Sequence, residues 1–128
     1  MNALELKQKP TKELLKIAEE HGLKHVSRQK KADIIFNILK TISKDGKELL
    51  GGGILETLPD GFGFLRSPWG SYLAGPDDVY VSPSQIRKFN LRTGDFVVGN
   101  IRPPREKERY FDLVQVESIN DNEPSKTQ

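Results

Sequence analysis

The chain has 128 residues, of which 35% are hydrophobic and 30% charged, the balance of an ordinary globular protein with one domain or two small ones. It contains no cysteine, which excludes disulfides, thiolate metal sites and cysteine nucleophiles. No apolar run approaches the roughly 18 residues of a membrane span, and no secretory signal begins the sequence, so we expect a cytoplasmic protein.

The net charge of +2 is unevenly distributed. Residues 1–47 contain 11 Lys and Arg against 6 Asp and Glu, a net of +5, and residues 48–128 contain 9 against 12, a net of −3. The basic half can approach a polyanion by electrostatic attraction. The acidic half, if it binds nucleic acid, must do so mainly through the bases.

Three short helices are predicted in residues 1–47, where apolar side chains recur at helical spacing. Asn2 begins the first, because Glu5 three residues later completes a capping box. Thr11 and Ser27 are the caps expected for the second and third helices. Together they predict a small helical bundle that needs packing support from the rest of the chain.

The periodicity changes after Gly51–Gly53, which we take as the boundary between the bundle and a second domain over residues 51–119. Asp45–Gly46 is expected to end the third helix, with a further turn over residues 47–50. Beyond the glycines, alternating patterns predict five strands, over residues 54–58, 62–66, 78–81, 96–102 and 110–119.

Ser82 and Pro83 begin a short helix after the third strand, as cap and first helical residue. Five short strands with a helix after the third fit an oligonucleotide-binding (OB) barrel. The predicted fold class is therefore α+β, a small helical bundle followed by a five-stranded OB-fold barrel. The tail, residues 120–128, has little to bury and is expected to be disordered.

Phe62 and Phe64 lie two apart in a predicted strand and so share one face, with Gly61 and Gly63 flanking and separating them. Glycine in a strand packs poorly, which favours an open platform on which bases stack over a packed core. Two core phenylalanines beside a tight turn are the alternative.

Arg66 continues this alternation, while Leu65 points inward. On the third strand Asp78 and Tyr80 are expected to point outward and Val79 inward. A carboxylate can accept from the cytosine amino group and an arginine can donate to its N3 or O2, so the Arg66–Asp78 pair predicts a preference for cytosine over uracil. A surface salt bridge of little energetic value is the alternative.

The loop before the last strand offers a second set of side chains. Tyr80 and Tyr110 could sandwich a base, Glu108 could accept a hydrogen bond at the pocket edge, and Arg109 could meet a phosphate. A charged hairpin tip is the alternative. Signals for an enzyme are absent: the glycines at 51–53 lack the lysine of a phosphate-binding loop, and neither a metal nor another cofactor is expected in this chain.

Asp60–Arg66 and Val79–Val81 resemble the two RNA-binding signatures of bacterial cold-shock domains. Residues 72–87, 89–95 and 101–104 resemble the N-terminal region of the bacterial transcription termination factor Rho family, and the segment around Asp33–Phe36 also fits. The resemblance extends over nearly the whole chain to about Ile119, and motifs of this length are specific.

The resemblance implies a primary binding site for cytosine-rich single-stranded RNA in a cold-shock-like barrel preceded by a helical subdomain. It implies a hexameric parent, an RNA-dependent ATPase and helicase that acts on RNA polymerase complexes, with ATP and Mg²⁺ bound in a downstream domain that this chain lacks. The predicted RNA-binding set is Leu58, Gly61, Phe62, Gly63, Phe64, Leu65, Arg66, Asp78, Val79, Tyr80, Glu108, Arg109 and Tyr110. The alternative function is a protein-interaction adaptor whose exposed aromatic face binds a partner protein.

Overall fold

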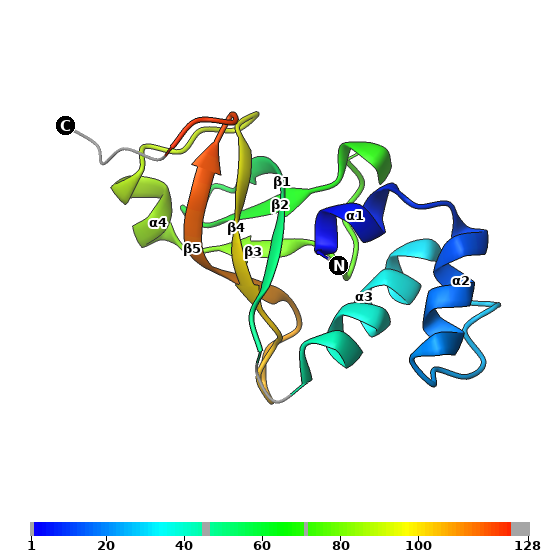
Figure 1. Ribbon diagram of the computed structural model, residues 1–128. Coiled ribbons are helices and arrows are strands. Elements are labelled where there is room, and N and C mark those ends of the chain that lie inside the picture. The colour runs from blue at the N-terminus through cyan, green and yellow to red at the C-terminus, as the bar shows by residue number, and fades with distance from the viewer. Residues whose placement is uncertain (1, 45–46, 71, 124–128) are drawn as a thin grey trace.

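The computed structural model describes residues 2–44, 47–70 and 72–123. Its helical segment comprises α1 (Ala3–Gln8), α2 (Thr11–Glu20) and α3 (Lys31–Ile42), which lie beside a barrel of strands (Figure 1). Fully buried side chains from all three helices join the inward side chains of the barrel in one core. The bundle is thus packed against the barrel, as its small size requires.

Of the N-cap residues predicted for α1, α2 and α3, only that of α1 is correct. Asn2 Oδ1 accepts the Glu5 N–H at 2.8 Å, which confirms the predicted cap of α1. The caps predicted at Thr11 and Ser27 are wrong, because the residues that precede α2 and α3 are Pro10 and Lys30. Neither of these makes a side-chain cap hydrogen bond, so burial of an apolar face stabilises both helices instead.

The barrel contains five strands and closes on itself in the order β1-β2-β3-β5-β4. All neighbouring pairs are antiparallel except β3 and β5. The elements after α3 are β1 (Leu49–Thr57), β2 (Gly63–Arg66), the 3₁₀ turn η2 (Pro68–Gly70), β3 (Val79–Val81), α4 (Pro83–Lys88), β4 (Phe96–Arg102) and β5 (Phe111–Ile119). This confirms the predicted α+β class and the OB-fold barrel.

The first strand begins earlier than predicted. β1 starts at Leu49, so the turn expected over residues 47–50 is wrong, and the glycines at 51–53 lie inside the strand. The first part of β1 pairs with β4 and its last part pairs with β2. Where β1 passes from one partner to the other, its backbone lies close to those of its neighbours. A Cβ on Gly52 would lie 2.4 Å from the Val97 carbonyl oxygen, so only glycine fits. Residues 45–46 lie outside the described residues.

The chain after β5 begins with ordered residues. Asn120 N–H donates to the Phe96 carbonyl at 2.7 Å, and Asn120 Oδ1 accepts the Phe96 N–H at 2.9 Å. The expectation of disorder from residue 120 is therefore wrong for Asn120, which pairs with the backbone N–H and C=O groups of Phe96, the first residue of β4. Residues 124–128 lie outside the described part of the chain.

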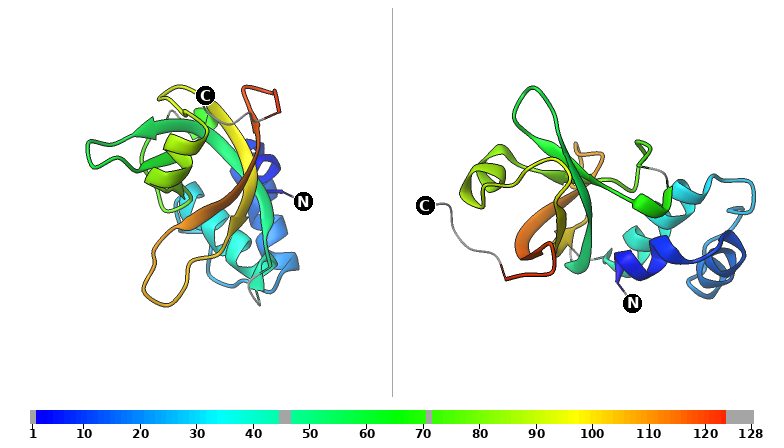
Figure 2. Two further views of the ribbon diagram at one scale, coloured as in Figure 1. Left: turned by 90° about the vertical axis from the view of Figure 1, so that its left-hand side faces the viewer. Right: turned by 90° about the horizontal axis from the view of Figure 1, so that it is seen from above.

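Two connections rise on the same side of the barrel: the β1–β2 turn and the β4–β5 loop (Figure 2). The predicted site residues lie in these two connections, in β2, and in β3 with the residue before it. In the described residues, no helix has the length and apolar character needed to cross a bilayer.

Candidate nucleic-acid interface

One row of side chains crosses four strands on the outer surface of the barrel. The register pairs Glu56 with Phe64, Phe64 with Tyr80, and Tyr80 with Asp112. Residues that oppose each other directly in neighbouring strands share a face, so these four side chains are neighbours. The alternate residues Leu55, Leu65, Val79 and Val81 are buried in the barrel, which confirms the inward positions predicted for Leu65 and Val79.

Four aromatic rings cluster along this row. Phe64 lies 4.8 Å from Tyr110 and 6.0 Å from Tyr80, measured between ring centroids. Phe62 lies 5.7 Å from Tyr80 and 5.9 Å from Phe64. All four rings are half-buried, and none belongs to the core. The alternative of two core phenylalanines is therefore wrong, and the rings form a partly exposed surface that we call the aromatic face (Phe62, Phe64, Tyr80 and Tyr110).

Gly63 has a different role from the one predicted. It is buried rather than exposed between the rings, and a Cβ there would lie 2.8 Å from both the Glu56 carbonyl oxygen and Leu55 Cδ1. Glycine is thus required because β1 and β2 approach closely behind the aromatic face. Gly61, with a φ of +93°, forms the exposed turn before it.

Arg66 connects the aromatic face to two carboxylates. Its Nη1 forms an ion pair with Glu56, and its Nε lies 3.3 Å from Asp78 Oδ2. Nε is buried and makes no hydrogen bond to any described residue, so the contact with Asp78 is electrostatic. The guanidinium carbon lies 5.8 Å from the Phe64 ring centroid, within cation–π range.

Asp78 is not the exposed charge that the alternation predicted, because only 4% of its surface is accessible. Oδ2 accepts the Gly75 N–H at 3.1 Å as well as facing Arg66. Burial raises the pKa of the carboxyl, while the Gly75 hydrogen bond and Arg66 oppose that rise. The ion pair of the alternative reading is present, but it is largely buried and does not lie on the surface. Oδ1 accepts no hydrogen bond from the described residues.

A cavity of about 340 Å³ lies at the other end of the row, lined by Tyr80, Glu108, Arg109, Tyr110 and Asp112. Tyr80, Glu108 and Tyr110 thus lie together, as predicted. Glu108 accepts two hydrogen bonds from Arg102, at 2.9 and 3.1 Å, and one from the Arg105 backbone N–H at 2.9 Å. These bonds lower the pKa of Glu108 to about 2 and keep it ionised.

Three charged residues of this surface were not among those predicted from the sequence. Glu56 and Asp112 lie at outward positions of alternating strands, a signal that was available. Arg102 donates to Asp112 Oδ2 at 2.9 Å as well as to Glu108. That pairing depends on irregularities in the β4–β5 register, which no local pattern reveals.

The remaining predicted residues occupy different environments. Leu58 is half-buried in the β1–β2 turn, where its N–H donates to the Phe62 carbonyl at 2.8 Å. Arg109 is exposed at the cavity mouth. The side chains of Leu65 and Val79 face the core, and at most 1% of either residue is accessible. No group of three His, Cys, Asp or Glu side chains in the described ranges could hold a metal ion.

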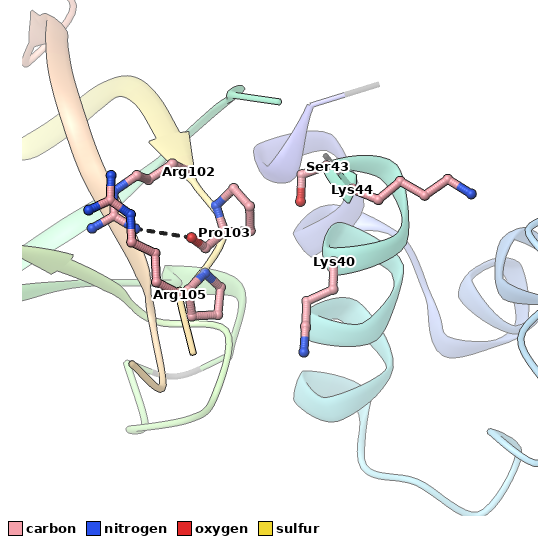
Figure 3. Close-up of a pocket in the computed structure, with 7 residues that line it drawn as sticks. Lys40, Ser43, Lys44, Arg102, Pro103 and Arg105 are labelled. Carbon is pink, nitrogen blue, oxygen red and sulfur yellow. Dashed lines mark hydrogen bonds between the residues drawn. The ribbon is translucent and has the colours of Figure 1, made fainter. Parts of the chain in front are cut away.

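A separate cleft of about 420 Å³ lies between the end of α3 and the residues that follow β4. Lys40, Lys44, Arg102 and Arg105 are among its lining residues. Figure 3 shows that the ends of Lys40 and Lys44 extend in different directions, with Lys44 pointing away from the barrel. These cations therefore do not converge on one anion position, in contrast to the side chains around the aromatic face.

Comparison with known proteins assigns the family. Residues 51–125 match the family described as Rho termination factor, RNA-binding domain, and residues 5–47 match Rho termination factor, N-terminal domain. Transcription termination factor Rho of Pseudomonas fluorescens biotype C is 61% identical over 124 residues, which are 97% of this chain and 30% of that protein. Its counterparts from Haemophilus influenzae and Escherichia coli (strain K12) are 58% identical, with the same two shares covered. The chain thus spans about 30% of the length of these relatives, and it belongs to the transcription termination factor Rho family.

Proposed function

We propose that the barrel binds cytosine-rich single-stranded RNA and is the primary RNA-binding site of a Rho-type termination factor. The observation that carries this proposal is the aromatic face, four half-buried rings in contact on the outer surface of a barrel that matches an RNA-binding domain. Bases stack on such rings with about 1–3 kcal/mol each, and only unpaired bases expose the surface that stacks.

The charged groups at both ends of the aromatic face supply base selection in this proposal. Arg66 donates to N3 or O2 of a cytosine, and Asp78 Oδ1 accepts from its amino group. In the cavity, Glu108 retains acceptor capacity beyond its bonds to Arg102 and Arg105, because a carboxylate offers about four lone-pair sites. Uracil reverses the donor and acceptor at positions 3 and 4 and fits both places worse.

The activity of the whole parent protein is also proposed, because this chain spans only about 30% of the length of its relatives. We propose a cytoplasmic homohexamer whose further domains bind ATP and Mg²⁺ and translocate along RNA toward RNA polymerase complexes. This chain would load the RNA and contribute no catalytic group.

The test is titration of the chain with cytidine, uridine and adenosine oligonucleotides of equal length, monitored by isothermal titration calorimetry. The proposal predicts tightest binding to oligo-C, weaker binding to oligo-U and the weakest to oligo-A. Equal affinity for all three would contradict base selection. A protein-interaction adaptor would bind none of them, and RNA would then not compete with its partner for the aromatic face.

A further inference from the structure

Lys7 is a buried lysine at the contact between α1 and the loop that precedes β3. Only 2% of its surface is accessible, and it is one of the largest fully buried side chains. Its Nζ donates to the Asp77 carbonyl oxygen at 2.9 Å and lies 4.0 Å from Asp77 Oδ2. A lysine is rarely buried so completely unless it is paired, which indicates a specific role for this contact.

The carbonyl that Lys7 binds belongs to the peptide that joins Asp77 to Asp78. On the other side of this peptide, Asp78 N–H donates to the Gly75 carbonyl at 3.1 Å, and Asp78 Oδ2 accepts the Gly75 N–H at 3.1 Å. The orientation of Asp78 is therefore fixed by the turn that begins at Gly75 and by Lys7 on the preceding carbonyl.

Asp78 in turn faces Arg66, 3.3 Å from Nε, and the Arg66 guanidinium lies over the Phe64 ring. A continuous series of contacts thus leads from α1, through Asp77 and Asp78, to the edge of the aromatic face. The charged groups along this series also interact electrostatically. Arg66 forms ion pairs with both Glu56 and Asp78, and Lys7 offsets the negative charge of Asp77 and Asp78.

We infer that Lys7 is a positioning residue for base selection: α1 holds the 77–78 peptide so that Asp78 and Arg66 present their polar atoms to a cytosine edge. Arg66 and Lys7 both offset the charge of Asp78, and Arg66 already contacts it at 3.3 Å. Without Lys7, Arg66 offsets that charge without the second cation and is drawn from the base toward Asp78. Asp33 and Lys31 also influence Asp77 and offset each other in charge. The inference rests on the proposed function and assigns the helical segment a part in specificity.

The test compares Lys7→Met with Lys9→Met, a control that removes an equal charge from the residue after the same helix. Lys9 has a partly exposed side chain and, among the described residues, forms an ion pair only with the exposed Glu13, so its loss leaves the 77–78 peptide untouched. In Lys7→Met the preference for oligo-C over oligo-U should fall by about tenfold, as expected for loss of one base-edge contact, with oligo-U affinity little changed. An equal proportional loss for both oligonucleotides, or no loss, would overturn the inference.

A second readout needs no RNA. The Arg66 Nε–H resonance should shift in Lys7→Met and stay in place in Lys9→Met, because only the first variant releases the partner of Arg66. If Lys7→Met does not fold, Lys7→Gln, which keeps a shorter uncharged donor, carries the same two predictions. The two readouts separate the two claims. If the unmodified chain binds RNA without base preference but Lys7→Met still shifts the Arg66 resonance, cytosine selection is refuted and the positioning contact is retained. An unmoved Arg66 resonance would refute the positioning itself.

Discussion

Phe64 and Tyr110 meet edge to face, with ring centroids 4.8 Å apart and an interplanar angle of 61°. Phe64 comes from β2, and Tyr110 immediately precedes β5. Such a pair contributes about 0.5–1.5 kcal/mol beyond its buried area, so each ring holds the other in place before a ligand arrives. A preformed stacking surface reduces the entropy lost on binding.

Phe64→Ala should weaken binding of oligo-C, oligo-U and oligo-A alike, by about 1–3 kcal/mol, because stacking does not depend on base identity. Trp69→Ala is the matched control, since Trp69 is an exposed aromatic residue outside the aromatic face. Isothermal titration calorimetry gives all three affinities. A loss confined to oligo-C would show that Phe64 reads the base instead of stacking on it.

Asp78→Asn should erode the preference for oligo-C over oligo-U while the affinity for oligo-U changes little. The amide keeps the shape of the carboxyl but weakens the electrostatic contact with Arg66. Glu117→Gln, which removes the charge of an exposed carboxylate of β5, is the control. Equal preferences in both variants and in the unmodified chain would exclude Asp78 from base selection.

Acidification should act on the two acidic groups at different pH. The pKa of Asp78 is raised, chiefly by burial, so it binds a proton at a higher pH than an ordinary aspartic acid. The pKa of Glu108 is lowered to about 2, chiefly by the hydrogen bond from Arg102, so Glu108 stays ionised throughout that range. The contribution of Asp78 to cytosine preference should thus be lost first. Carboxyl carbon resonances followed by NMR would report both titrations, and a reversed order would contradict the geometry.

Arg102→Met should raise the pKa of Glu108 from about 2 toward 4.5, the ordinary value for a glutamic acid, because the bidentate partner is gone. A lowered folded-state pKa stabilises the native chain at pH values above 4.5, and this contribution is lost as the pH falls toward 2. The variant should lack that pH-dependent component in urea unfolding. Arg92→Met, an exposed arginine away from Glu108, is the control. An unchanged Glu108 titration in Arg102→Met would show that Arg102 is not its partner in solution.

Gly63→Ala should lower the melting temperature, because a Cβ at this position lies 2.8 Å from backbone that cannot move aside. Gly70→Ala is the control, since its Cβ would meet only Ser67 Cβ at 3.9 Å. If the two variants melt at the same temperature, β1 and β2 do not approach as closely as described.

Alternation predicted correctly the direction of several strand residues. It gave the shared face of Phe64 and Tyr80 and the inward positions of Leu65 and Val79. Alternation failed where contacts between distant parts of the chain determine whether a side chain is buried. Asp78 has the outward parity but is buried beneath the turn at Gly75, and its partner Lys7 lies in a helix far away in sequence.

Glycine was the second source of error. At Gly51–Gly53 and Gly63, the sequence shows a residue that usually breaks or exposes a strand. In the barrel, Gly52, Gly53 and Gly63 allow neighbouring backbones to approach, and Gly51 leaves room for the Ile101 side chain. These contacts depend on the closed topology and not on local propensity.

The most direct test of the central claim is to locate bound RNA by nuclear Overhauser contacts between oligo-C and the labelled chain. Contacts from cytosine ring protons to the rings of Phe64 and Tyr80, with amide shifts concentrated in residues 61–66, 78–80 and 108–110, are the predicted result. Contacts confined to the helical segment, or an aromatic face whose resonances do not move at saturating RNA, would contradict it.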